Sequence, residues 1–380
     1  MLRLDRRYFH NFDWGLLLLV LVISGMALMN LYSASYPPSA YGIPPYLKQC
    51  YLFLMGGMGI LFILCFDYTE LHFWNYPFYI LIILLLAFVL VAGNSAGGAQ
   101  RWVNLGLFKL QPSELAKLML VVTLASYYSR KDENVGYGVK EMVTPILLTL
   151  LPFLLILKQP DLGTALMLGI IFVSMTVFAK IRWQTYVFGI GLGCFGGVFA
   201  WFNLLHPYQK RRIETLLDPG KDPMGQGYQI LQSKIAVGSG GINGKGYLEG
   251  TQGHLHFLPE RHTDFAFSVW CEEWGFSGSL FFLVAYFSML IWGLYVAMTA
   301  RDRFGVFLAY GVVMLIFWQA VINLLMILGF LPVVGIPLPL VSYGGSSLLT
   351  TLLGLGILMN VRMRRFQVGQ NLNMERVKQK

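Results

Sequence analysis

The chain has 380 residues, of which 56% are hydrophobic, 15% aromatic and only 12% charged. Because a soluble domain carries about 25% charged residues, this composition excludes a soluble globule. The 28 Lys and Arg against 19 Asp and Glu give a net charge of +9. In a membrane protein, such an excess of basic residues first indicates how the chain is oriented in the membrane. We expect no nucleic-acid partner.

Apolar stretches of roughly 17 to 25 residues, the length that crosses a hydrocarbon core about 30 Å thick, recur along the chain. They predict an all-α integral membrane protein with about ten transmembrane helices and a large structured extracytoplasmic loop. The predicted cores are residues 14–33, 47–66, 76–93, 112–128, 143–158, 161–179, 185–205, 267–298, 305–330 and 345–361. The stretch 267–298 is too long for one upright helix, so we expect it to be tilted, broken or begun outside the bilayer.

We expect one membrane domain over residues 1–380. Seven transmembrane helices are predicted within 1–205 and three within 264–361. The extracytoplasmic loop is predicted at 206–263, and a basic cytoplasmic tail at 362–380. The loop contains an amphipathic stretch and a glycine-rich series, and we expect it to lie ordered on the membrane. The glycine series lacks the spacing of a nucleotide-binding loop.

Basic residues in short loops predict the orientation. Under a ten-span count they fall on one side, which the positive-inside rule makes cytoplasmic, together with both termini. They are Arg3, Arg6, Arg7, Arg130, Lys131, Lys140, Lys180, Arg182, Arg301, Arg303, Arg362, Arg364 and Arg365. Long loops translocate largely regardless of charge, so the basic loop 206–263 is predicted outside.

Charged residues near predicted spans stand out, because a charge at the bilayer centre costs about 2.5–3.5 kcal/mol on insertion scales. Glu114 and Lys117 follow Pro112 at a helix start and share one face. In one interpretation Glu114 is a first-turn anion that Lys117 neutralises. In the other, Lys117 points into the bundle toward an anionic ligand.

Two further acidic residues lie where predicted outer loops enter the membrane. Asp161 repeats the Gln-Pro-acid pattern and is either a simple helix-start carboxylate or a partner for a cation. Asp264 lies at the junction of the loop with the long span, where exclusion of water would raise its pKa toward that of a useful base. The alternative is that Thr263 or Asp264 only caps the following helix.

Seven motifs in order along nearly the whole chain resemble the SEDS family (shape, elongation, division and sporulation). They are residues 98–102 (GAQRW), 111–114 (QPSE), 159–164 (QPDLGT), 208–219 (YQKRRIETLLDP), 232–236 (QSKIA), 259–264 (PERHTD) and 337–346 (PLPLVSYGGS). Within the family, 232–234, 250–252 and 259–264 are more similar to the elongation branch, RodA, than to the division branch, FtsW.

The resemblance implies ten transmembrane helices and a peptidoglycan glycosyltransferase that polymerises lipid II in the bacterial inner membrane. It implies an active site on the outer face and Asp264 as the catalytic carboxylate. The implied partners are a class B penicillin-binding protein, which cross-links the product, other elongation-complex proteins and membrane lipids.

The implied reaction needs a base for the acceptor hydroxyl and cations for the leaving pyrophosphate. We expect Asp264 to be the base. Glu114 and Asp161 are expected to hold cations in place. The candidate substrate-binding cations are Arg101, Lys117, Arg212, Lys234 and Lys245, with Lys117 and Arg212 favoured.

Three alternatives stay open at this point. The basic run 210–212 could instead touch anionic lipid headgroups. A divalent metal ion could bridge the pyrophosphate, although no cluster of ligating residues in the sequence predicts one. Finally, the membrane charges also fit a lipid II flippase or another lipid transporter, or a scaffold that only recruits cell-wall synthases.

Overall fold

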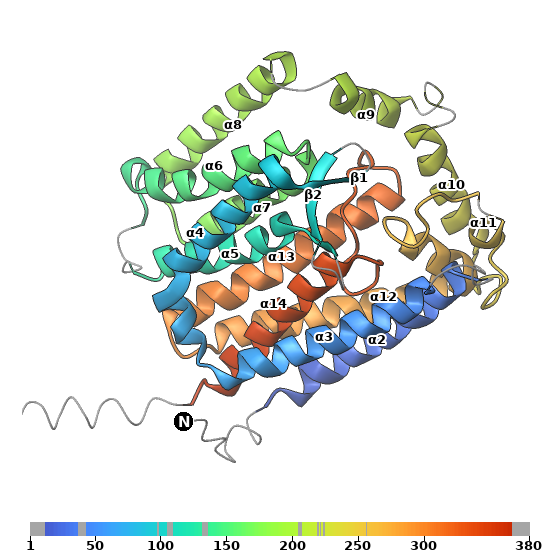
Figure 1. Cartoon of the computed structure of the whole chain (residues 1–380), viewed down its shortest axis with the longest axis horizontal. Coiled ribbons are helices and arrows are strands. Elements are labelled where there is room, and N and C mark those ends of the chain that lie inside the picture. Colours follow the sequence, from blue (N-terminus) through green and yellow to red (C-terminus); the bar gives the residue numbers. More distant parts are fainter. Residues whose placement is uncertain are drawn as a thin grey trace, which may run out of the picture.

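The computed structural model describes most of the chain (Figure 1). The described residues are 12–36, 43–96, 99–104, 109–130, 136–203, 207–218, 220, 222, 225–255 and 257–366. Arg3, Arg6, Arg7, Lys131, Pro219 and the tail from 367 onward, all part of the sequence predictions, lie outside these ranges.

A long helix covers each predicted apolar core. These helices are α2 (Trp14–Ala34), α3 (Pro45–Cys65), α4 (Tyr68–Ala92), α5 (Pro112–Tyr128), α6 (Val143–Lys158), α7 (Leu162–Phe178), α8 (Trp183–Asn203), α12 (Ala266–Met298), α13 (Arg303–Ile327) and α14 (Gly345–Met363). Eight are long and apolar enough to cross a membrane, α6 only together with the short helix of residues 139–142 before it, whereas α5 and α7 have 17 residues each. The all-α membrane fold is confirmed, and the count of ten crossings stays a prediction.

Shorter elements lie between the long helices. They are β1 (Asn94–Ala96), β2 (Ala99–Asn104), β3 (Lys109–Leu110), η2 (Val139–Met142), α9 (Pro207–Leu217), α10 (Gln226–Ser239) and α11 (Thr251–His254). The three strands form a small antiparallel sheet in the order β1-β2-β3, which the sequence did not predict. Val103 pairs with Leu110 and Asn104 with Lys109, so β2 is tied to the residues just before α5.

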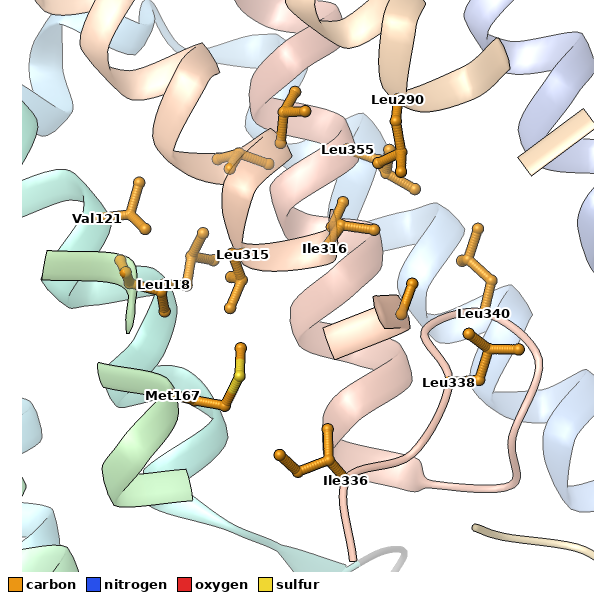
Figure 2. Packing of buried hydrophobic residues seen from close by; sticks show 14 of the residues in the cluster. Leu118, Val121, Met167, Leu290, Leu315, Ile316, Ile336, Leu338, Leu340 and Leu355 are labelled. Carbon is orange, nitrogen blue, oxygen red and sulfur yellow. The ribbon is translucent and has the colours of Figure 1, made fainter. Parts of the chain in front are cut away.

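The core lies where α5, α7, α13 and α14 meet (Figure 2). Leu118 of α5, Met167 of α7 and Leu315 of α13 point into it together. The segment between α13 and α14 is anchored to the same core by Ile336 and Leu338, which are buried. This segment therefore holds a fixed position at the start of α14.

The long apolar stretch is a helix broken at Gly275, one of the outcomes expected from its length. Gly275 has φ 62° and ψ −160°, a conformation that glycine adopts far more readily than other residues. The part of α12 before the break, residues 266–274, begins two residues after Asp264. The break therefore sets the direction of the helical segment that follows this carboxylate.

The glycine-rich segment 238–246 fills the break in α12. Four backbone hydrogen bonds join the two: Lys245 N to Glu272 O at 3.0 Å, Gly246 N to Glu273 O at 3.1 Å, Phe276 N to Gly241 O at 2.9 Å and Ser277 N to Ile242 O at 3.0 Å. A broken helix in a membrane protein needs such partners for the backbone groups that the break frees. The segment thus acts as a backbone partner of α12.

The amphipathic stretch predicted in the loop is α10, and it packs on protein. Its residues Ile230, Ser233 and Ala236 are buried, and α10 contacts α12 and α13. The hydroxyls of Ser233 and Ser268 lie 2.9 Å apart. The apolar face of α10, which we expected to lie on the membrane, therefore packs in part against α12. That the loop 206–263 lies outside the membrane stays a prediction.

Candidate active site

A polar cavity of about 330 Å³ opens where α5, α7 and α14 begin. Loop residues just before α12, the strand β2 and the helix α9 complete its wall. Five of the sequence-predicted site residues line it: Arg101, Glu114, Asp161, Arg212 and Asp264. A larger, mostly apolar cavity of about 720 Å³ lies at the other end of α14, around Phe62, Tyr68 and Asn360, and has none of these charges in its lining.

Asp264 is held in the cavity wall by its backbone. Asn323 of α13 donates its side-chain amide to the Asp264 carbonyl at 2.9 Å and to the Ile336 carbonyl at 2.8 Å. The carboxylate itself accepts no hydrogen bond from any described residue. Burial, and secondly the nearby Glu260 carboxylate, raise the pKa of Asp264 to about 6, against the opposing effect of Arg212.

The capping interpretation of Thr263 and Asp264 is wrong. The N-cap of α12 is Phe265, and no side chain caps this helix. The Thr263 hydroxyl instead donates to the Glu260 carboxylate at 2.8 Å. Asp264 is therefore left without a capping role, and its carboxylate is available to a ligand in the cavity.

Arg212 projects from α9 into the same cavity. Its guanidinium lies 5.8 Å from the ring centre of Tyr208, and its Nε is buried without a hydrogen-bond partner. No described carboxylate forms an ion pair with it. Burial lowers the pKa of Arg212, but a guanidinium remains charged in proteins. A half-buried cation with a free donor is suited to an anionic ligand.

Asp161 is the N-cap of α7, as one interpretation of the sequence held. It accepts hydrogen bonds from the Thr164 amide at 3.2 Å and the Thr164 hydroxyl at 3.0 Å. It also lies 3.9 Å from the Arg101 guanidinium. Arg101 donates to the Gln159 and Pro160 carbonyls as well. The carboxylate thus both caps a helix and positions a cation at the cavity edge.

Glu114 and Lys117 form a buried ion pair at the base of the cavity. The Lys117 ammonium lies 2.7 Å from Glu114 Oε1, with side-chain exposures of 2% and 6%. Glu114 Oε2 is buried without a partner and its residue lines the cavity, whereas Lys117 is not among the described lining residues. Lys117 therefore acts on the cavity through Glu114.

The other two predicted cations lie away from this cavity. Lys245 pairs with the fully buried Glu272 at 2.6 Å, and Glu272 also accepts from the Thr251 and Gln252 amides. Lys234 lies on α10 over Gly329, where an added Cβ would come 2.2 Å from its Cε. A substrate-binding role for Lys234 and Lys245 stays a prediction.

A family model described as cell cycle protein, FtsW/RodA/SpoVE, matches residues 13–367. The chain belongs to this family. The SEDS family predicted from the seven motifs is thereby confirmed. A similar relative is the peptidoglycan glycosyltransferase MrdB of Escherichia coli, which is 40% identical over 299 residues, 79% of this chain and 80% of the relative.

Two solved structures share the fold of this SEDS protein. One, described as "Structural coordination of polymerization and crosslinking by a peptidoglycan synthase complex", has a TM-score of 0.80 at 36% identity and covers 94% of this chain and 99% of that chain. The crystal structure of the rod shape determining protein RodA of Thermus thermophilus has a TM-score of 0.69 at 32% identity, with coverages of 94% and 98%.

Sequence reasoning missed several residues of the SEDS cavity. Glu260, Gly335, Tyr343 and Ser347 line it, yet none had been assigned a role. All but Gly335 and Ser347 lie inside quoted motifs, so the motifs could have indicated Glu260 and Tyr343. Ser347 directly follows the last motif, and only the fold shows that it faces the cavity.

Across the described part of the chain, no three His, Cys, Asp or Glu side chains gather in an arrangement that could hold a metal ion. Of the cavity carboxylates, Glu114 pairs with Lys117, Asp161 with Arg101 and Glu260 accepts from the Thr263 hydroxyl, whereas Asp264 stands alone. That a divalent metal ion bridges the diphosphate is untested and stays a prediction.

Proposed function

We propose that this SEDS protein is a peptidoglycan glycosyltransferase that polymerises lipid II into β-1,4-linked glycan strands. One observation carries the proposal: a half-buried carboxylate with a raised pKa, Asp264, shares a cavity with the unpaired guanidinium of Arg212. The two groups are what transfer from a lipid diphosphate donor requires, a base and a cation. The relationship to MrdB supports the same activity.

In this mechanism Asp264 accepts the proton of the 4-hydroxyl of the acceptor N-acetylglucosamine as that oxygen attacks the anomeric carbon. The bond from this carbon to the lipid diphosphate breaks, and the diphosphate leaves. An α-linked donor that gives a β-linkage inverts the anomeric centre, so one base suffices and no second carboxylate nucleophile is needed. General-base catalysis supplies about 10²–10⁴-fold, and positioning supplies much of the rest.

Arg212 stabilises the charge that develops on the leaving diphosphate. Its planar guanidinium matches phosphate oxygens, and its Nε is free to donate. Arg101, which Asp161 and two backbone carbonyls hold, adds positive charge at the cavity edge. Lys117 contributes by fixing Glu114, whose second oxygen faces the cavity without a partner.

The proposal includes a place and a partner for this activity. The cavity would open on the outer face of the bacterial inner membrane, where lipid II becomes available. A class B penicillin-binding protein would cross-link the strands, since a structure of a peptidoglycan synthase complex shares this fold. The likeness to RodA and MrdB supports a role in cell elongation.

The test is strand synthesis by the purified protein from lipid II, with and without the partner. We expect Asp264→Asn to lose about 10²–10⁴-fold in rate, because the amide cannot accept the proton. Glu214→Gln is the matched control, because Glu214 is an exposed carboxylate on α9 outside the cavity lining. The enzyme assignment would be refuted if the wild type made no strands, or if it translocated lipid II without making polymer. Undiminished synthesis by Asp264→Asn would refute the base.

A further inference from the structure

Three helices, α5, α7 and α14, begin with residues that line the cavity, and two of them carry their own negative charge there. Glu114 lies in the first turn of α5, and Asp161 caps α7. Helix α14 follows Gly344, has no side-chain cap and has no acidic residue in its first turn. The positive end of its dipole is therefore not compensated by the protein.

The first backbone N–H groups of α14 have no acceptor among the described residues. The first bond of the helix runs from Leu348 N to Gly344 O at 2.8 Å, which leaves the N–H groups of Gly345, Ser346 and Ser347 unused. Ser346 and Ser347 are only 2% and 7% exposed. Buried N–H groups are nearly always paired in proteins, and no described residue accepts from those of Ser346 and Ser347, so these donors are open to a ligand in the cavity.

The Ser347 side chain adds a further donor at the same place. Its hydroxyl is buried without a hydrogen-bond partner, and the residue lines the cavity. The neighbouring hydroxyl of Ser346 is already engaged, since it accepts from Gln111 N at 2.8 Å and donates to Lys109 O at 3.1 Å. Of the two serine hydroxyls in the first turn of α14, that of Ser347 is therefore the one available to a ligand.

The charge balance of the cavity calls for such a group of donors. Arg101 lies beside Asp161, and Lys117 is paired with Glu114. Arg212 is then the cavity cation without an ion pair among the described residues. A diphosphate carries more than one negative charge, and Asp264 is also anionic when it acts as a base. One guanidinium does not balance these charges, and an uncapped helix start adds positive potential.

We propose that the N-terminus of α14 and the Ser347 hydroxyl bind a phosphate group of the lipid-linked diphosphate, on a subsite separate from Arg212. The backbone N–H groups of residues 345–347 and the Ser347 hydroxyl donate to phosphate oxygens. This inference rests on the proposed function for the identity of the ligand, and it adds a binding residue that the catalytic scheme does not contain.

Binding of undecaprenyl diphosphate to the full-length protein in detergent tests the subsite. Ser347→Ala should weaken binding roughly tenfold, because one hydrogen bond to a charged group is lost. Ser347→Asp should abolish binding, because its carboxylate would repel the phosphate and compensate the helix dipole in its place. The matched control is Thr350→Val, which removes another buried hydroxyl without a partner on α14, outside the cavity lining.

Two ligand comparisons identify what is bound. Undecaprenol, which has the same tail without phosphate, should bind all variants equally. Inorganic diphosphate should fail to displace the lipid at similar concentration; if it displaced the lipid, the site would belong to free diphosphate and the inference would be overturned.

Wild-type binding by both Ser347 variants, or an equal loss in Thr350→Val, would also overturn it. Strand synthesis by the wild type, measured separately, tests the enzyme function. A Ser347-dependent lipid site in a protein that makes no strands would leave the inference standing while the function fails. If the Ser347 variants bound the lipid and made strands normally, the enzyme function would stand and the inference would fail.

Discussion

A carboxylate that accepts a proton must be ionised when substrate arrives. Burial and the Glu260 charge raise the pKa of Asp264 to about 6. The group is protonated and inactive below this pH and ionised above it. We therefore expect kcat/KM for strand synthesis to rise with pH through about 6 and then to level off. A pH–rate profile of the wild type checks this, and a flat profile from about pH 5 to 8 would contradict the base role.

The charges beside Asp264 should move this profile in opposite directions. Glu260→Gln removes a repelling carboxylate, which lowers the pKa of Asp264 and shifts the rise in activity to lower pH. Arg212→Ala removes an attracting cation and shifts the rise to higher pH, in addition to weakening catalysis. Glu70→Gln, at the other end of the bundle, should leave the midpoint unchanged. Shifts of equal sign for Glu260→Gln and Arg212→Ala would refute this electrostatic account.

The Glu114–Lys117 pair has a structural role that can be separated from a role in catalysis. Glu114→Gln leaves the Lys117 ammonium buried without its counter-charge, which costs about 3–5 kcal/mol in comparable cases. We expect a lower Tm in detergent for Glu114→Gln and recovery when Lys117→Met is added, measured by thermal unfolding. If the stable double variant still makes no strands, the pair also serves the reaction. A double variant less stable than the single one would contradict the pairing argument.

Individual charges were predictable in this chain because charge is scarce there. Asp264, Glu114 and Asp161 each stand out at the edge of an apolar run, and each lies in the cavity. Their partners were predictable only when close in sequence, as for Glu114 and Lys117. Lys245 pairs with Glu272, 27 positions away, because the loop folds back onto α12, and no local pattern carries that information.

At the scale of elements, the break in α12 and the glycine-rich segment 238–246 that bonds to it together orient the residues following Asp264. Gly244→Ala should disrupt it, because Gly244 has φ +79° and an added Cβ would lie 2.1 Å from the Glu273 carbonyl oxygen. We expect a strong loss of both Tm and strand synthesis. Circular dichroism melting and the lipid II assay measure the two effects.

Two other glycines of the same segment serve as graded controls. Gly241 has φ +55° but open space around an added Cβ, so Gly241→Ala should cost only the backbone strain of about 1–2 kcal/mol. Gly238 lies in α10 with neither feature, so Gly238→Ala should behave like the wild type. If Gly244→Ala were as stable as Gly238→Ala, the glycine segment would not support the break.

The length of the apolar runs made the long helices predictable, but not how they are joined. The run 267–298 indicated that one span had to be tilted, broken or extended, while the place of the break depends on which loop can supply backbone partners. The sheet β1-β2-β3 was missed for a related reason. Its strands have two to six residues, too short for a periodic pattern, and pairing with each other is what makes them strands.

On the scale of the whole molecule, the bundle has two chemically different ends. The cavity lies at the starts of α7 and α14, whereas Lys180 and Arg303, after α7 and at the start of α13, line a common cavity at the other end. Arg362, at the end of α14, donates to Thr299 there. Basic residues from several short loops thus gather at one end, which the positive-inside rule predicts to be cytoplasmic.

Single cysteines placed at the two ends test this orientation in a chain whose own four cysteines are replaced. Leu217, the last residue of α9, is 82% exposed, and Phe366, after α14, is 62% exposed, so neither substitution disturbs packing. We expect a membrane-impermeant maleimide to label Leu217→Cys in intact spheroplasts, and Phe366→Cys only after permeabilisation. Leu255→Cys, 61% exposed in the loop, should follow Leu217→Cys. Labelling of Phe366→Cys alone in intact spheroplasts would place the Asp264 cavity on the cytoplasmic side, where it could not deliver strands to the cell wall.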